Sequence, residues 1–298
     1  MLIGIAAAVL LFGGPLLLGL AGVLSPHRPV RNKVRPAWDW QLMASAALWY
    51  AIAFNLTFLI QELFLALPKA LLPGVHATLF HNNHTWEGTH PLTSLFQGTG
   101  VLATFASAGV CAHRLQRRPP VSRDLRLFLI WMIYDGLLMG LPQIANGTVN
   151  GASDVGMAMN YLGLGGNARV VIALIALAAV PVVALSLTPA LLALADSPQR
   201  LAGGRARTLF ISNIATVPAL IGLLLIIPLR VPREWVEVLL PPVVVTAIGI
   251  PWIQAGAWRV HGVTPAVVAP LRPPVEPLLL LLGLLLVFQL LLRPGIRL

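Results

Sequence analysis

Charged residues are scarce in this chain. Asp, Glu, Lys and Arg make up only 10% of its 298 residues, whereas 57% are hydrophobic. A soluble domain carries roughly a quarter of its residues as charged side chains. A surface with so few charges is unsuited to water over most of its area. The sequence therefore predicts that most of the surface faces lipid.

Cysteine is almost absent, and acidic residues are few. The single Cys111 excludes an internal disulfide and any cysteine-rich metal site. Basic residues outnumber acidic ones by 20 to 10, but they fall in short clusters between apolar runs. Clusters of this kind set the orientation of membrane helices, whereas a nucleic-acid-binding face needs its basic residues side by side. Nucleic acid is therefore excluded as a partner.

Long apolar runs are abundant instead. A helix needs about 20 mainly apolar residues to cross a bilayer with its backbone groups paired internally. Eight runs satisfy this length, which predicts an all-α, polytopic membrane helix bundle that forms one domain over residues 1–298. The predicted spans are Leu2–Leu24, Trp40–Leu67, Leu92–Ala112, Leu125–Pro142, Ala168–Leu192, Leu209–Leu229, Val236–Trp258 and Pro277–Leu292.

The basic residues sort to alternate loops. Fourteen of the twenty lie after the first, third, fifth and seventh spans. Lys and Arg collect in cytoplasmic loops, so these loops are predicted to be cytoplasmic and both termini extracytoplasmic. The compositional bias toward Ala, Leu, Pro and Arg suggests a bacterial inner membrane. The long loops 68–91 and 143–167 would then be periplasmic, and long loops of this kind usually have a function.

Two acidic residues fall within the predicted spans. Glu62 lies near the outer end of the second span, and Asp135 lies past the middle of the fourth. A carboxylate at membrane depth costs roughly 2.5–3.5 kcal/mol on insertion scales, so it is usually neutralised, paired or turned toward a water-filled cavity. Apart from Arg126 at the cytoplasmic end of the fourth, neither predicted span contains a Lys or Arg that would pair with these acids. Both are therefore candidate functional residues.

The first outer loop is rich in metal-capable side chains. His81, His84, Glu87 and His90 follow one another at intervals of three, which would place neighbours on one face of a helical turn. Imidazole and carboxylate groups are ligands for zinc, copper or iron, so the four residues are candidate ligands of a divalent transition metal. The alternative is a solvated surface loop in which Trp86 anchors at the lipid headgroups.

The second outer loop contains a helix start. Ser153 and Asp154 are residues that cap free backbone amides, which predicts a short helix over residues 155–164. Asp154 is expected to belong to this cap, and a supporting ligand role beside the histidine loop is the second interpretation.

The stretch QELFLALPKALLPG, from Gln61 to Gly74, and the small-residue stretch QGTGVLATFASAG after it resemble the site-2 protease family of membrane metalloproteases. The resemblance implies that Glu62 matches the catalytic glutamate and that Asp135, followed by Gly136, matches a zinc-ligating aspartate. Gln61 and Leu65 stand where that family has its two zinc-binding histidines. A glutamate of this kind needs metal-bound water, so the resemblance implies a proteolytically inactive relative.

Three functional hypotheses follow from these residues. The first is a non-proteolytic membrane protein whose outer polar pocket, lined by Glu62, Asp135 and the histidine loop, binds a metal ion or a small polar ligand. The second is an accessory subunit of a larger membrane complex, with other membrane protein subunits and lipid as partners. The third is a membrane metallohydrolase with a relocated metal site. The balance of the residues favours a function other than catalysis.

Overall fold

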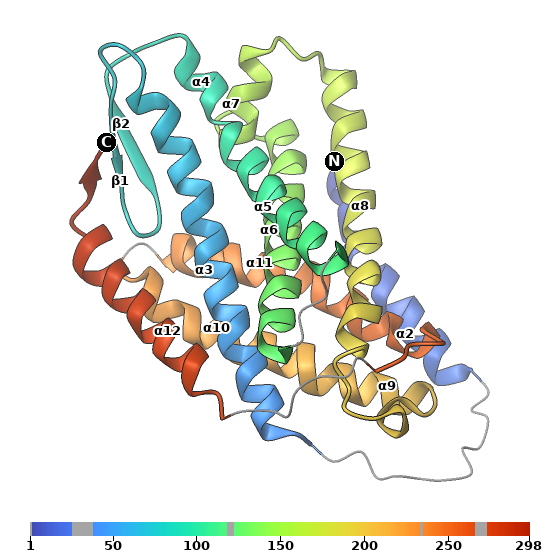
Figure 1. Ribbon diagram of the computed structural model, residues 1–298. Coiled ribbons are helices and arrows are strands. Elements are labelled where there is room, and N and C mark those ends of the chain that lie inside the picture. Colours follow the sequence, from blue (N-terminus) through green and yellow to red (C-terminus); the bar gives the residue numbers. More distant parts are fainter. Residues whose placement is uncertain (1, 26–37, 118–121, 233–234, 266–272) are drawn as a thin grey trace.

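Helices dominate the computed structural model (Figure 1), which describes residues 2–25, 38–117, 122–232, 235–265 and 273–298. Within these residues, eight helices are long and apolar enough to cross a membrane. The predicted multi-pass helix bundle is confirmed. The spans are Gly4–Leu24, Trp40–Ala70, Leu92–Arg117, Arg123–Val149, Gly166–Leu192, Gly204–Arg230, Trp235–Arg259 and Val275–Leu292.

Several spans are built from more than one helical segment, and in the described part of the chain two short helices, α7 and η2, lie outside the spans. The helices are α1 (Leu2–Ala8), η1 (Val9–Gly13), α2 (Gly14–Leu24), α3 (Trp40–Ala70), α4 (Leu92–Phe96), α5 (Thr99–Arg117), α6 (Arg123–Val149), α7 (Asp154–Tyr161), α8 (Gly166–Leu192), η2 (Pro198–Leu201), α9 (Gly204–Ile211), η3 (Ser212–Thr216), α10 (Val217–Arg230), α11 (Trp235–Gly256), η4 (Ala257–Arg259), α12 (Val275–Leu286) and η5 (Val287–Leu292).

The outer loops differ from their predicted extents. Helix α3 continues through Pro68 to Ala70, and α6 continues through Pro142 to Val149. The prediction of a helix start at Ser153 is confirmed, because the Ser153 hydroxyl accepts a hydrogen bond from the Gly156 amide at the start of α7. Helix α7 ends at Tyr161, so the second loop is shorter and more helical than its sequence range suggested.

The first outer loop contains a small antiparallel sheet of strands β1 (His76–Leu79), β2 (His84–Glu87) and β3 (Ile296–Arg297). Strand β1 lies in the middle, pairing His76 with Glu87 on one side and Leu79 with Ile296 on the other. The C-terminal strand thus lies beside the hairpin, at the end of the bundle where α3 and α6 finish (Figure 1). The pairing supports the prediction that the C-terminus and the histidine loop share one side of the membrane.

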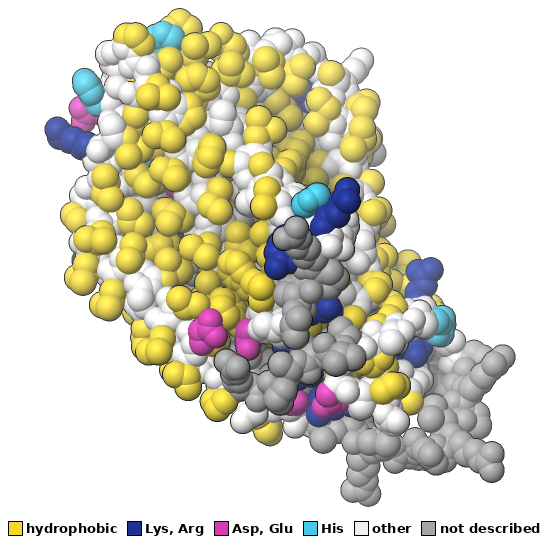
Figure 2. All heavy atoms as spheres, in the orientation of Figure 1, with side chains coloured by type: hydrophobic (Ala, Val, Ile, Leu, Met, Phe, Trp, Pro, Cys, Tyr) yellow, Lys and Arg dark blue, Asp and Glu magenta, His cyan; other side chains and the backbone are white. Residues whose placement is uncertain are grey.

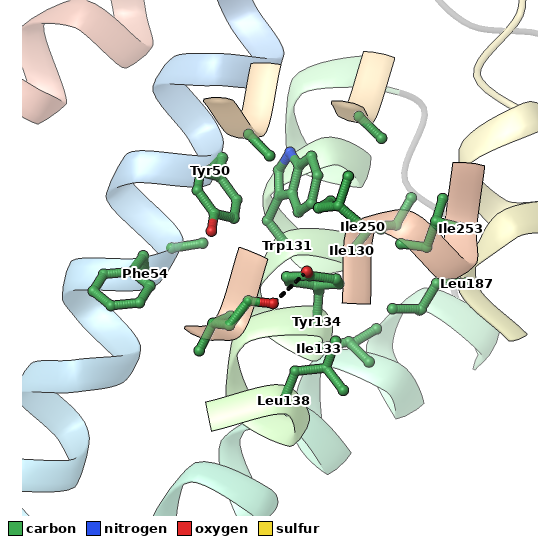
Figure 3. Close-up of a cluster of buried hydrophobic side chains, with 14 of the residues drawn as sticks. Tyr50, Phe54, Ile130, Trp131, Ile133, Tyr134, Leu138, Leu187, Ile250 and Ile253 are labelled. Atoms are coloured by element: carbon green, nitrogen blue, oxygen red, sulfur yellow. Dashed lines mark hydrogen bonds between the residues drawn. The ribbon is translucent and has the colours of Figure 1, made fainter. Parts of the chain in front are cut away.

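Helices α3 and α6 form the centre of the bundle. They are the most buried spans, whereas the first and last spans expose most of their side chains, as helices facing lipid should. An aromatic cluster joins the two central helices at Tyr50, Trp131 and Tyr134 (Figure 3), and the Tyr134 hydroxyl donates to the Val245 carbonyl of α11 at 2.8 Å. Edge-to-face rings of this kind add to the stabilisation from burial.

Small residues set the closest helix contacts. A Cβ at Gly136 of α6 would lie 2.7 Å from the Thr104 carbonyl oxygen and 2.9 Å from the Ala108 side chain of α5. In a bilayer, helices associate mainly through close packing, because lipid removes the hydrophobic drive between them. The Gly- and Ala-rich sequence of α5 is therefore explained by its approach to α6.

Prolines in the spans leave backbone carbonyls without their helical donors, and side chains supply the missing hydrogen bonds. Pro68 has no N–H for the Phe64 carbonyl, which accepts from the Thr99 hydroxyl of α5 instead. Pro241 and Pro242 likewise free the carbonyls of residues 237 and 238, and both accept from the guanidinium of Arg230. These side chains lock α5 to α3 and α10 to α11.

Polarity divides the surface. The face in Figure 2 is mostly hydrophobic over the helices, and most of its visible charged side chains gather in the lower part. The sequence assigns that end, with the Arg-bearing turns, to the cytoplasm.

We predict that the hairpin is accessible from outside the cell and that the turn at η2 is not. In a Cys111→Ser background, a membrane-impermeant maleimide should label His76→Cys on intact cells and leave Gln199→Cys unlabelled. Both positions are exposed, so both should react once detergent opens the membrane. If only position 199 were labelled on intact cells, the protein would have the opposite orientation in the membrane.

Candidate functional site

A chain of hydrogen-bonded ionisable side chains lies at the hairpin end of α3. Glu62 and Lys69 are seven residues apart, which places them on one face of the helix. His84 of β2 lies between them: its Nδ1 is 2.8 Å from Glu62 Oε2, and its Nε2 is 2.8 Å from Lys69 Nζ. An ammonium only donates hydrogen bonds, so Nε2 accepts from Lys69 and the Nδ1–H donates to Glu62.

Lys69 is fully enclosed although it carries a charge. Its side chain donates to Gln97 Oε1 at 2.9 Å as well as to His84, and its Nζ lies 4.2 Å from the centre of the Trp86 ring. The Trp86 ring also stacks on His84. Hydrogen bonds and a cation–π contact thus replace the water that burial removes.

The role of Lys69 corrects one sequence inference. The second span was expected to hold no cation for Glu62, but α3 extends to Ala70 and therefore includes Lys69. The interval of seven residues from Glu62 was the signal in the sequence. The connection through His84 depends on the hairpin and had no sequence signal.

A cavity of about 500 Å³ lies beside Glu62, between α3, α6, the start of α7 and α11. Two carboxyl groups line it, those of Glu62 and Asp154. Amide side chains adjoin them, and Gln143 Nε2 donates to Gln61 Oε1 at 2.7 Å. The remaining lining residues are Phe58, Leu138, Met139, Pro142, Asn146, Ser153, Val155, Leu240, Pro241, Val244 and Val245.

Asp154 reaches the cavity because the Ser153 cap places it in the first turn of α7. Burial raises the pKa of its carboxyl above the ordinary value, and the negative charge of Glu62 raises it further. His84 and Lys69 act in the opposite direction. The two carboxyl groups therefore line one cavity, and the negative charge of Glu62 acts on Asp154 there.

Asp135 was expected to line the outer polar pocket together with Glu62, but it lies elsewhere. It is completely buried in α6, it does not line the cavity beside Glu62, and its two carboxyl oxygens have no hydrogen-bond partner among the described residues. The resemblance to site-2 proteases makes Asp135 a zinc ligand and Glu62 the catalytic glutamate; in the structure the Glu62 carboxylate accepts a hydrogen bond from His84. Gly136 has a packing role against α5, and the resemblance stays a prediction.

Three of the proposed metal ligands, His81, His84 and Glu87, lie in the hairpin; His90 follows it, and none of the four lies on a helical turn. His84 and Glu87 belong to β2, and an interval of three residues turns them to opposite faces of a strand. His81 Nε2 lies 3.2 Å from the Arg230 carbonyl, and His90 Nδ1 accepts from the Leu92 amide. The helical spacing argument was therefore wrong, because cross-strand pairing fixed the conformation of this segment.

No group of three or more His, Cys, Asp and Glu side chains that could hold a metal ion occurs within the residues that the structure describes. The metal site formed by His81, His84, Glu87 and His90 stays a prediction. What the structure brings together is Glu62, His84, Lys69 and Asp154, of which Lys69 was absent from the sequence-based candidates.

No family model, curated protein or solved structure matches this chain. The helices and their composition define it as a multi-pass helical membrane protein. Its function must be argued from the cavity and the side chains around it.

We predict that His84 is essential to the stability of the hairpin end. His84→Ala would leave the buried Glu62 and Lys69 without their shared hydrogen-bond partner, and a buried polar group that loses its partner costs about 1–3 kcal/mol, with charged groups costing more. Thermal unfolding in detergent should show a large loss for His84→Ala. His76→Ala, on the exposed side of the same hairpin, should change stability by less than about 0.5 kcal/mol. Equal losses in the two variants would contradict this.

The raised pKa of Asp154 gives stability a pH dependence of defined sign. Between the ordinary and the raised pKa of this carboxyl, the folded protein binds more protons than the unfolded chain. The free energy of unfolding contributed by Asp154 should therefore fall as the pH rises through that interval. Melting curves of the wild type and Asp154→Asn should diverge there, with Asn gaining relative stability at the higher pH. Parallel curves would contradict it.

Proposed function

We propose that this membrane protein binds a small, positively charged, amphipathic ligand in the cavity beside Glu62. The observation that carries the proposal is the pair of carboxyl groups, Glu62 and Asp154, on the wall of one cavity. They are the only charged side chains among its lining residues. A cation between them would relieve their mutual repulsion and restore the interactions that each lost on leaving water.

The two nearby cationic side chains, Lys69 and Arg230, do not neutralise the carboxyl groups that line the cavity. Lys69 turns its ammonium toward His84, Gln97 and Trp86, and it does not line the cavity. Arg230 donates to the carbonyls of residues 237 and 238 and packs on the Phe58 ring at 4.1 Å. Both cations are bonded to other groups and neither lines the cavity, so the charged groups on the cavity wall are carboxyl groups alone.

The remaining wall supports an amphipathic ligand over a bare ion. Most lining side chains are apolar, from Phe58 on α3 to Val245 on α11, with amides at Gln61, Gln143 and Asn146. Small-molecule sites are commonly mostly apolar cavities of about 300–1,000 Å³ with a few oriented polar groups. A primary amine on a short apolar body matches this surface, since its ammonium pairs with the carboxylates and its carbon skeleton covers the walls.

The hydrogen-bonded chain behind Glu62 would keep the site ready for its ligand. His84 holds one carboxylate oxygen of Glu62 at 2.8 Å, while the other oxygen has, among the described residues, only a long contact of 3.5 Å from Gln61. The second oxygen is thus the better acceptor for an incoming ammonium. Preorganised groups of this kind lower the entropic cost of binding.

We expect benzylamine to raise the melting temperature of the detergent-purified protein and benzyl alcohol, its neutral counterpart, to leave it unchanged. Glu62→Gln and Asp154→Asn should each weaken benzylamine binding by about tenfold or more, because a charge-assisted hydrogen bond contributes about 1.5–3 kcal/mol. Isothermal titration of the same samples measures the loss.

Glu237→Gln is the matched control, since this exposed carboxyl lies outside the cavity. Equal responses of all three variants, or an equal effect of benzyl alcohol, would refute an amine site. A stoichiometric response to Zn²⁺ that His81→Ala/His84→Ala abolishes would favour the metal site in its place.

A further inference from the structure

A second, larger hollow lies among α2, α9, α11 and η4, away from the hairpin. It measures about 810 Å³, and its walls include Leu16, Leu20, Leu209 and Trp258. These elements meet in the lower right of Figure 1, at the end that the basic residues assign to the cytoplasm. We call this hollow the α2 groove. It shares no lining residue with the cavity beside Glu62.

Small residues and one tryptophan shape the α2 groove. A Cβ at Gly19 would find its nearest neighbour, the Ala255 side chain, at 3.9 Å, so the space above Gly19 is open. Trp258 donates its Nε1–H to the Leu18 carbonyl at 3.2 Å, which fixes α2 against the end of α11. Tryptophan favours the interfacial depth of a membrane. Trp258 therefore predicts that the groove opens at the level where lipid headgroups meet acyl chains.

The polar side chain on the floor of the groove already has its hydrogen bonds within the protein. Gln254 is the amide there, and its carbonyl oxygen already accepts from the Ser212 and Thr216 hydroxyls. Its amide nitrogen donates to the Thr208 carbonyl at 3.1 Å. With this side chain satisfied, the interior of the groove is suited to hydrocarbon.

The α2 groove has one positively charged side chain, Arg205, among its lining residues. Arg205 lines the groove and is exposed, and no ion pair joins it to an acidic side chain in the described part of the chain. Arg207, two residues on, differs: it donates to the carbonyls of Trp258 and Leu201 at 2.8 and 3.2 Å. Arg205 thus retains a full set of donors beside an apolar groove at the membrane surface.

We propose that the α2 groove is a binding site for an anionic phospholipid, whose acyl chain lies in the groove and whose phosphate pairs with Arg205. The guanidinium matches phosphate oxygens in a two-pronged geometry. The first span leaves most of its side chains outside the protein interior, so we expect the groove to be continuous with the bilayer that supplies the lipid. Basic pockets between helices on the cytoplasmic side commonly select acidic headgroups.

The test uses the full chain, purified in a non-ionic detergent and incubated with phosphatidylglycerol or phosphatidylcholine. Native mass spectrometry counts the bound lipid, and a thermal assay measures its effect on stability. We expect the wild type to bind phosphatidylglycerol more tightly than phosphatidylcholine. Arg205→Gln should lower phosphatidylglycerol affinity by about tenfold and leave phosphatidylcholine binding unchanged.

Gly19→Leu fills the groove and should reduce the binding of both lipids. Should this variant fail to fold, Leu20→Trp narrows the groove at an exposed wall position instead. Arg117→Gln, an exposed arginine at the end of α5 outside the groove, is the control and should bind as the wild type does.

Three outcomes would overturn the proposal. The first is unchanged phosphatidylglycerol binding by Arg205→Gln. The second is an equal stabilisation of the wild type by inorganic phosphate alone, which would show an anion site with no use for the acyl chain. The third is a dimer of the wild type that Gly19→Leu disrupts while lipid binding persists, which would make the groove a contact between copies of the chain.

Discussion

The bilayer interior offers no water, so a polar group at membrane depth must find its partner within the protein or, like the Asp135 carboxyl among the described residues, remain without one. This constraint gives the helices their length, and it also governs the exceptions to regular helix. Where proline removes a backbone donor, a side chain from a neighbouring helix replaces it: Thr99 serves the carbonyl of Phe64, and Arg230 serves those of residues 237 and 238. The bonds that compensate for proline are also the bonds that join helices.

The same constraint explains the hairpin end. Lys69 is a charged group in the last turn of α3, and on its own it would destabilise the fold by burial. The hairpin supplies His84 and Trp86 to it, and His84 in turn binds Glu62. Two opposite charges that are separated along one helix are thereby joined through a strand. The hairpin thus supplies the partners that the charged side chains of α3 lack within their own helix.

The two hollows of the molecule have opposite character. The cavity beside Glu62 carries only carboxyl groups as charges and lies toward the hairpin, whereas the α2 groove carries Arg205 and lies toward the Arg-rich end. Beside the Glu62 cavity, the ammonium of Lys69 is already bonded to His84. In the α2 groove, the amide of Gln254 is already bonded to residues of α9 and η3. The lining of each hollow therefore matches the ligand proposed for it, a cation beside Glu62 and an anionic phospholipid in the α2 groove.

Local chemistry along the chain determined the eight apolar spans and the helix start at Ser153, because length, hydropathy and capping act over a few neighbouring residues. Tertiary structure alone decided three things. Cross-strand pairing, and not the three-residue spacing of His81 and His84, fixed the first outer loop. Packing of α7 against α6 brought Asp154 to the cavity of Glu62, and the hairpin brought His84 to Lys69. Such contacts join residues far apart in sequence, and no local pattern records which of them will meet.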